Sequence, residues 1–297
     1  MTDSNIVVVT GANGLVGSRT SAALLDRGAT VRAVVRRPGT APAGAEEWVG
    51  DFADPGFAAG VVEGASAVVT TVHPLGSELA TQHEVAVVGT PVVARAARDA
   101  GVGRFVHVST AGVYARTAGV GDVDEAGELV GDDGGDYPVT KRDTDAALAE
   151  VDGLTRVLVR PPAILGPGES SVWNTLRPAA VRDDEAERHA VPDKTFAWVH
   201  VDDLATLIAD VATGRIATST DPDSGPLDGG CTVVNVAAGP ATQRDYLGTV
   251  TAALGVEPVW DDEPAWTGQI RADRAHRWGW KPSVELSEAL AEIEAGL

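Results

Sequence analysis

Short runs of β-branched residues alternate with longer stretches of helical pattern through the first half of this 297-residue chain. Strands are predicted at residues 6–9, 30–35, 47–50, 67–72, 104–109 and 155–160, and helices at 15–27, 78–100 and 137–151. Regular alternation of strand and helix is typical of parallel βαβ units. The pattern therefore predicts an α/β fold with a doubly wound parallel sheet. Right-handed crossovers place the loops that follow the strands at one edge of that sheet, where ligands bind.

The second half of the chain lacks this regular alternation. Proline and glycine mark a loop at 161–168, and residues 218–230 indicate an exposed loop. Further helices are predicted at 201–212, 243–254 and 284–295, and a strand at 233–236. We therefore expect a first domain over 1–165 and a smaller, mainly substrate-binding lobe over 166–297, with segments at about 197–215 and 231–237 returning to the core. Candidates to line an apolar pocket in this lobe are Trp173, Trp198, Trp260 and Trp266.

A glycine-rich segment, Thr10-Gly-Ala-Asn-Gly-Leu-Val-Gly17, joins the first predicted strand to the first predicted helix. Glycine lets the backbone turn tightly and lets a pyrophosphate approach the N-terminus of a helix. The spacing is G-x-x-G-x-x-G rather than the commoner G-x-G-x-x-G, but its position between strand and helix favours a phosphate-binding loop. The first domain is thus predicted to be a Rossmann-type dinucleotide-binding domain, with Gly11, Asn13, Gly14, Leu15 and Gly17 as cofactor-binding residues.

The end of the second strand indicates which dinucleotide is bound. NAD-binding proteins tend to carry an acid there for the ribose 2′-hydroxyl, whereas this chain has Arg36 and Arg37. Because guanidinium groups suit a 2′-phosphate, NADP is the predicted cofactor, with NAD as the alternative. Asp51 is a candidate to accept a hydrogen bond from the adenine amino group, and an exposed loop aspartate is the competing interpretation. Further cofactor-binding candidates at the ends of the third and fourth strands are Phe52, Thr71, Val72 and His73.

Tyr137-Pro-Val-Thr-Lys141 is the segment with the clearest chemical pattern. A spacing of four places both side chains on one face of a helix. An ammonium group near a phenol stabilises the phenolate and lowers the phenol pKa, toward the range useful for general acid–base catalysis. We therefore expect Lys141 to lower the pKa of Tyr137. A surface Tyr–Lys pair is the competing interpretation of so short a pattern.

Two hydroxyl residues, Ser109 and Thr110, follow the fifth predicted strand at the same edge as the glycine loop. They are candidates to bind a substrate oxygen beside the tyrosine. With these motifs the chain resembles the extended or atypical short-chain dehydrogenases/reductases of the NAD-dependent epimerase/dehydratase group. The resemblance covers nearly the whole chain and includes Val159-Arg-Pro-Pro-Ala-Ile-Leu-Gly-Pro167, Val199-His-Val-Asp-Asp-Leu-Ala205 and Trp278-Gly-Trp-Lys-Pro282.

The resemblance implies roles for the residues that match the family motifs. Tyr137 would be the general acid or base and Lys141 its modulator, while Thr110, more than Ser109, would bind the substrate oxygen. Pro161, Ala163 and Ile164 fall in the stretch that passes the nicotinamide in the family. The nicotinamide exchanges the hydride, and the protein supplies binding, orientation and the proton.

Departures from the family pattern narrow the expected reaction. Dehydratases carry an Asp-Glu pair after the hydroxyl residue, where this chain has Ala111 and Gly112, and nucleotide-sugar epimerases often carry asparagine at the position of Ala163. We therefore expect an NAD(P)-dependent oxidoreductase that reduces a carbonyl or oxidises an alcohol. One alternative is a nucleotide-sugar epimerase, and another is a non-catalytic dinucleotide sensor. The diphosphate of a nucleotide sugar would need basic contacts, for which the candidates are Arg177, Arg182, Lys194 and Arg271.

Composition limits the partners and the compartment. The formal net charge of -20 argues against nucleic acid and anionic membranes as partners. The single cysteine, Cys231, excludes an intrachain disulfide, and no metal-ligand spacing is recognisable. No apolar run is long enough for a membrane span and no signal peptide is recognisable, so a cytoplasmic protein is expected. The expected ligand is a small carbonyl or sugar substrate, and the resemblance allows a homodimer through helices 78–100 and 137–151.

Overall fold

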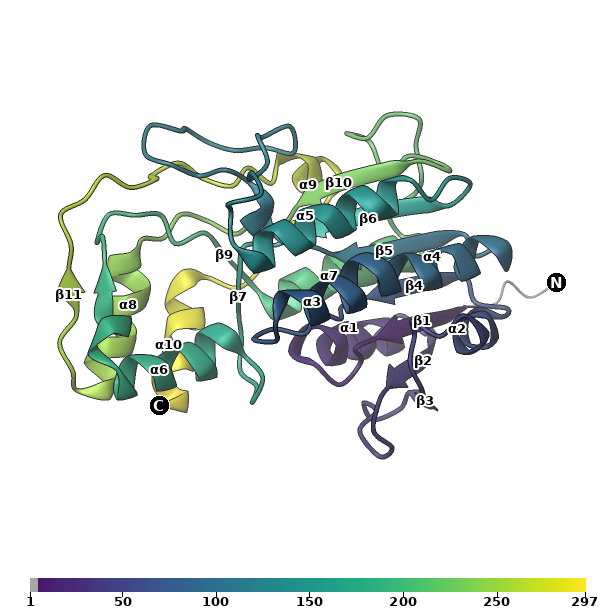
Figure 1. Ribbon diagram of the computed structural model, residues 1–297, viewed down its shortest axis with the longest axis horizontal. Helices are drawn as coiled ribbons and strands as arrows, with labels where there is room; N and C mark the ends of the chain where they lie inside the picture. The colour runs from purple at the N-terminus through teal and green to yellow at the C-terminus, as the bar shows by residue number, and fades with distance from the viewer. Residues whose placement is uncertain (1–4) are drawn as a thin grey trace.

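The computed structural model describes residues 5–297, and its centre is a parallel sheet of seven strands in the order β10-β6-β5-β4-β1-β2-β3 (Figure 1). The strands are β1 (Ile6–Thr10), β2 (Thr30–Val35), β3 (Glu46–Val49), β4 (Ala67–Thr70), β5 (Arg104–Val108), β6 (Thr155–Arg160) and β10 (Cys231–Asn235). The order runs outward in both directions from β1, as a doubly wound fold requires. The predicted α/β fold is confirmed, and β10 adds an edge strand beside β6.

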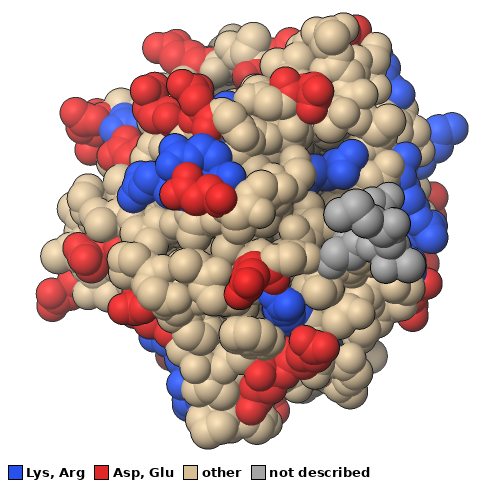
Figure 2. All heavy atoms as spheres, turned by 90° about the vertical axis from the view of Figure 1, so that its right-hand side faces the viewer, with Lys and Arg blue, Asp and Glu red and all other residues tan. Residues whose placement is uncertain are grey.

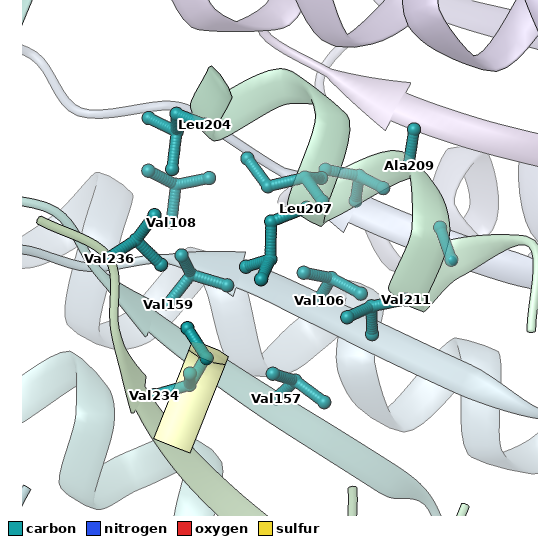
Figure 3. Close-up of a cluster of buried hydrophobic side chains, with 14 of the residues drawn as sticks. Val106, Val108, Val157, Val159, Leu204, Leu207, Ala209, Val211, Val234 and Val236 are labelled. Carbon is teal, nitrogen blue, oxygen red and sulfur yellow. The ribbon is translucent and has the colours of Figure 1, made fainter. Parts of the chain in front are cut away.

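Helices cover both faces of the sheet, which is why its central strands are almost wholly apolar. On one face α1 (Leu15–Asp26) packs on α7 (Val201–Ala212), and on the other lie α2 (Pro55–Val62), α4 (Thr90–Asp99) and α5 (Asp136–Ala149). Successive strand residues point to opposite faces. Val106 and Val108 therefore face Leu207 of α7 together with valines of β6 and β10 (Figure 3), whereas Phe105 packs in the core on the other face.

The helix predicted over 78–100 consists of three consecutive segments. They are α3 (Leu79–Gln82), the π-helical turn η1 (His83–Gly89) and α4. Pro91 lies near the start of α4, but the helical backbone continues into α4 from η1, so its missing N–H removes one bond to the preceding turn. The predicted helical stretch is present, and its backbone changes from π-helical to α-helical hydrogen bonding just ahead of this proline.

A second group of elements lies beside the carboxyl end of the sheet (Figure 1). Its short strand pairs are β7 (Ala163–Leu165) with β9 (Trp198–His200) and β8 (His189–Ala190) with β11 (Val259–Trp260), and its helices are α6 (Arg177–Asp183), α8 (Gln243–Leu254) and α10 (Leu286–Gly296). They share a separate core that includes Trp198, Tyr246 and Ile293. We call this core the lobe core.

Three elements from the second half of the chain pack with the sheet domain. They are α7, β10 and α9 (Asp273–Arg277), which contacts β10. The short segments η2 (Ala111–Val113), η3 (Val172–Leu176) and η4 (Glu185–Arg188) complete the described structure. The functional division of the chain at residue 165 stays a prediction.

Charged side chains are interspersed on the face shown in Figure 2, where acidic groups lie beside basic ones with uncharged surface between them. Over residues 5–297, no helix is long and apolar enough to cross a membrane. The same residues contain no group of three or more His, Cys, Asp and Glu side chains arranged to hold a metal ion.

Candidate active site

A cavity of about 850 Å³ opens at the carboxyl ends of the central strands. Its volume is in the range of small-molecule and cofactor sites. The cavity lies at the point where the strand order reverses: the chain runs from β1 outward to β2 and β3, and then crosses from β3 to β4 on the other side of β1. Open α/β sheets bind ligands at such a point. The loops after β1 to β4 form one wall, and Tyr137 with residues 162–173 contributes to the other.

The glycine loop lies between β1 and the first turn of α1 with little room for side chains. Gly11 has φ of +69°, a conformation that favours glycine. A Cβ atom on Gly17 would lie 2.1 Å from the carbonyl oxygen of Gly11, so α1 packs directly on the loop backbone. Gly14 caps α1 and donates its N–H to the Gly11 oxygen at 3.0 Å. The predicted loop residues Gly11, Asn13, Gly14, Leu15 and Gly17 all line the cavity.

Two exposed cations lie at the same end of the cavity. Arg36 and Arg37 both line it, and among residues 5–297 neither forms an ion pair. The Glu47 carboxylate accepts hydrogen bonds from the backbone N–H groups of 39–41, which holds the loop after the arginines and lowers the Glu47 pKa. Asp51 and Phe52 line the cavity as well, and the Asp51 carboxylate accepts a bond from the N–H of Ala53.

Tyr137 lies in the cavity wall near the N-terminus of α5. Burial raises the pKa of its phenol, and a hydrogen bond with the Thr110 side chain lowers it in part. The His73 ring meets the Tyr137 ring edge-on, with centroids 4.8 Å apart. Burial and the charge of Lys141 lower the pKa of His73 to about 4. The phenol is therefore protonated and the imidazole neutral near pH 7.

Lys141 lies one turn further along α5, buried beneath the cavity. Its Nζ donates a hydrogen bond to the carbonyl oxygen of Val108 at 2.8 Å. Burial lowers its pKa to about 8, and the charge of Asp145 opposes that shift. The expectation that Lys141 lowers the Tyr137 pKa is wrong for this structure, because burial dominates and the phenol pKa is raised.

Ser109 has a different position from the predicted one. Its hydroxyl donates to the Asp145 carboxylate at 2.9 Å, and its side chain is buried outside the cavity lining. Pro161 and Ala163 are also absent from the lining. Ala163 pairs with Trp198, and the Pro161 carbonyl accepts the N–H of Ala111. Of the remaining candidates, Thr71, Val72, His73 and Ile164 line the cavity.

Sequence reasoning missed most of the wall around Tyr137. The additional lining residues there are mainly apolar: Pro74, Leu75, Val85, Pro162 and Val172, with Thr81 and Ser170 as the polar exceptions. Of the four candidate tryptophans only Trp173 lines the cavity, while Trp198 and Trp266 are buried elsewhere. The apolar residues follow no motif, so tryptophan content was the only signal that pointed to this wall.

The four basic candidates for a diphosphate lie outside the cavity lining. Arg177 pairs with Glu187, and Arg182 pairs with Asp183. Arg271 pairs with Asp122 and Asp273. Lys194 is exposed. The part of the cavity near Tyr137 therefore presents no free cation from this set.

The sequence pattern of the family described as "NAD dependent epimerase/dehydratase family" matches residues 7–217. The chain belongs to this family. Members of the family are NAD-dependent enzymes, and this chain has the sheet, the glycine loop and the tyrosine–lysine pair in the arrangement described above. The predicted family is confirmed.

Named relatives include a 4-hydroxy-2-methyl-3-oxo-4-farnesyl-3,4-dihydroquinoline-1-oxide ketoreductase from Stigmatella aurantiaca. It is 29% identical over 263 residues, which cover 84% of this chain and 73% of the relative. A 3 beta-hydroxysteroid dehydrogenase/Delta 5→4-isomerase from Mycobacterium tuberculosis is 31% identical over 189 residues, covering 59% of this chain. The match spans only 51% of that relative.

Solved structures share the whole fold at low identity. UDP-glucose 4-epimerase from Thermotoga maritima has a TM-score of 0.76 at 19% identity, over 98% of this chain and 97% of that one. A dTDP-glucose 4,6-dehydratase from Streptomyces venezuelae, solved with NAD, has a TM-score of 0.76 at 23% identity, over 98% and 96%. At this identity the likeness establishes the fold.

Proposed function

We propose that the protein is an NADP-preferring oxidoreductase that reduces the carbonyl group of an uncharged, largely apolar substrate. The observation that carries the proposal is a protonated phenol, Tyr137, in the wall of a cavity that also contains the glycine loop and two unpaired arginines. A proton donor and a dinucleotide-binding end within one cavity are what carbonyl reduction requires.

The residues around the loop after β1 fit a dinucleotide. Gly17 has no room for a side chain, and Gly11 forms a left-handed turn. No side chain at these two positions covers the backbone N–H groups at the start of α1. Such N–H groups suit a pyrophosphate. Arg36 and Arg37 are exposed at the end of β2, where a 2′-phosphate would be bound. An acidic protein that binds NADP needs such a local concentration of positive charge.

The raised pKa of Tyr137 favours reduction over oxidation. The bound nicotinamide supplies the hydride. The Tyr137 hydroxyl, which is protonated at neutral pH, donates its proton to the substrate oxygen as negative charge develops there. The Thr110 hydroxyl, which lies outside the cavity lining, hydrogen-bonds the phenol and orients it. Lys141 is buried beneath the cavity, one turn further along α5 than Tyr137, and is the buried cation nearest to it in sequence.

The apolar wall defines the substrate class. Leu75, Val172 and Trp173 face the cavity, and Leu75 is 60% exposed at its rim. Burying such side chains against a ligand is favourable only when the ligand is itself apolar. The relatives named as a ketoreductase of a farnesylated quinoline and as a hydroxysteroid dehydrogenase support a bulky, apolar carbonyl substrate.

A nucleotide-sugar epimerase is less well supported. Its substrate diphosphate would need cations, and the four basic candidates are either paired with acids or lie outside the cavity lining. A non-catalytic sensor is less well supported because it has no need of a phenol and an ammonium group placed one helical turn apart.

The test measures oxidation of NADPH and of NADH with steroid ketones and long-chain alkyl ketones, and in parallel the interconversion of UDP-glucose and UDP-galactose. We expect NADPH oxidation with at least one apolar ketone, and its loss in Tyr137→Phe with unchanged NADPH binding. Tyr246→Phe is the comparison variant: it removes a phenol hydroxyl that bonds the Trp173 carbonyl behind the cavity wall, so it can change KM but should retain turnover, because the Tyr137 phenol is still present. Sugar interconversion without net cofactor change, or full activity of Tyr137→Phe, would contradict the proposal.

A further inference from the structure

One face of α5 presents a tyrosine, a lysine and an aspartate at successive turns. Tyr137, Lys141 and Asp145 are spaced by four residues, which places their Cβ atoms about 5–6 Å apart along the helix. Lys141 and Asp145 are each only 3% exposed. The motif that marks the family ends at the lysine, so the aspartate is an additional buried charge on the same face.

The contacts of Asp145 leave one of its carboxylate oxygens unused. Its Oδ2 accepts hydrogen bonds from the Ser109 hydroxyl at 2.9 Å and from the Arg160 Nε–H at 3.0 Å, and the Arg160 Nη2 lies 2.9 Å from the same oxygen in an ion pair. Its Oδ1 is buried without a hydrogen-bond partner. Two nitrogens of one guanidinium hold the group as a carboxylate, although burial raises its pKa. An oxygen buried without a hydrogen bond adds to the cost of burying this carboxylate, and the positive charge of Lys141, one turn away on the same helix face, offsets part of that cost.

Few charged or titratable groups face Lys141. His73 follows β4 and His107 belongs to β5, and the charge of Lys141 helps to keep both rings neutral by lowering their pKa. Arg160 of β6 has the same sign of charge as Lys141, and Tyr137 on α5 is protonated. Within the described part of the chain, Asp145 is the only acidic group found to act on Lys141.

We propose that Asp145 is a positioning residue of the active site: held by Arg160 and Ser109, its carboxylate keeps Lys141 in the ammonium form although the amine is buried. The catalytic consequence rests on the proposed function, because a charged Lys141 matters for proton delivery through Tyr137. The charge state itself does not depend on any substrate.

Removing the negative charge of Asp145 should lower the pKa of Lys141. Without the Asp145 carboxylate, burial is the remaining influence on Lys141, and its pKa falls below the present value of about 8. Much of the amine then becomes neutral at neutral pH. In an active enzyme, the alkaline limit of kcat would move to lower pH by the same amount.

The pKa of Lys141 can be measured directly, because the chain has only three lysines: Lys141, Lys194 and Lys281. Carbon-13 at lysine Cε gives three NMR signals, whose chemical shifts follow amine ionisation during a pH titration. The Lys141 signal is assigned by its loss in Lys141→Met. Lys194 and Lys281 are exposed and act as internal controls.

In Asp145→Asn we expect the Lys141 pKa to fall by about one unit or more, with the other two lysines unchanged. Ser109→Ala is the matched control, since it removes a hydrogen bond to the same Oδ2 but keeps the carboxylate, and it should leave the Lys141 pKa in place. Asp145→Glu keeps a carboxylate at this position and should therefore hold the Lys141 pKa close to its value in the unaltered protein. Because Asp145→Asn leaves Arg160 without its acidic partner and can prevent folding, Asp145→Asn combined with Arg160→Gln is measured as well. A smaller fall is expected there, because the like charge of Arg160 is removed too and burial of the amine remains.

An unchanged Lys141 pKa in the folded asparagine variants would overturn the proposal, and so would an equal fall in Ser109→Ala. The result is independent of the proposed reaction. If the pKa falls as expected while no carbonyl substrate is reduced, the role of Asp145 stands and the oxidoreductase proposal fails.

Discussion

Replacement of Gly17 by alanine tests the close contact between α1 and the glycine loop. The new Cβ would lie 2.1 Å from the Gly11 oxygen, 2.8 Å from its carbonyl carbon and 2.9 Å from the Ala12 Cα. All three are backbone atoms, so the helix or the loop must move by about 1 Å to restore ordinary contact. Overpacking of this kind costs about 3 kcal/mol, and the gain in helix propensity from glycine to alanine returns about 1 kcal/mol. The net loss of unfolding free energy is about 2 kcal/mol.

Gly60→Ala is the matched control for this substitution. Gly60 also lies inside a helix, α2, but it is exposed and its Cβ would meet nothing within 4 Å. The same propensity gain should stabilise that variant by about 0.5–1 kcal/mol. Urea denaturation followed by circular dichroism gives both free energies, and fluorescence titration gives the NADPH affinity. We expect Gly17→Ala to lose most of its NADPH binding, while Gly60→Ala binds normally. Wild-type stability and affinity in Gly17→Ala would refute the packing argument.

Three further predictions concern charges. Arg36→Ala should weaken NADPH binding about five- to tenfold and leave NADH binding nearly unchanged in paired titrations; equal losses would exclude Arg36 as the 2′-phosphate ligand. The pKa of His73 is about 4 when folded and 6.5 when unfolded, so unfolding takes up protons between these values. The free energy of unfolding should therefore rise between pH 4 and 6.5. The rise should be less steep in His73→Phe. Part of it should remain in that variant, because burial also lowers the pKa of His107. Asp203→Ala should lose about 3 kcal/mol in urea denaturation, because Asp203 accepts bonds from the backbone and hydroxyl of Ser283; a loss below about 1 kcal/mol would contradict this.

The sheet was predictable because its strands are buried on both faces. Runs such as the one in β1 are almost continuously apolar and β-branched, and this composition indicates a strand without help from distant contacts. The short strands β7, β8, β9 and β11 have only two or three residues each. Segments so short form through tertiary contacts and leave no periodicity in the sequence. The helix α2 was missed although Asp54 caps it and Pro55 opens it, which are recognisable start signals.

The candidate site was predictable where residue spacing fixes geometry. The glycine loop and the Tyr137–Lys141 pair have fixed spacings on one element, and both are where the sequence placed them. Burial depends on the whole fold, so the raised pKa of Tyr137 had no local signal. Ser109 and Thr110 are adjacent, yet Ser109 reaches Asp145 two turns beyond Tyr137 on α5. A sequence motif identifies such hydroxyls but does not show that Thr110 bonds Tyr137, that Ser109 bonds Asp145, or that neither lines the cavity.

The two parts of the cavity depend on different cores. The glycine loop and the arginines are held by β1, β2 and α1, whose packing belongs to the sheet. Trp173 is held by the lobe core instead: its ring meets Phe196 and Tyr246 edge-on, and its carbonyl accepts the Tyr246 hydroxyl at 2.7 Å. Substitutions in the lobe core can therefore reshape the substrate wall without moving the glycine loop. The wall beside Tyr137 can therefore vary in shape while the glycine loop at the other end of the cavity is kept.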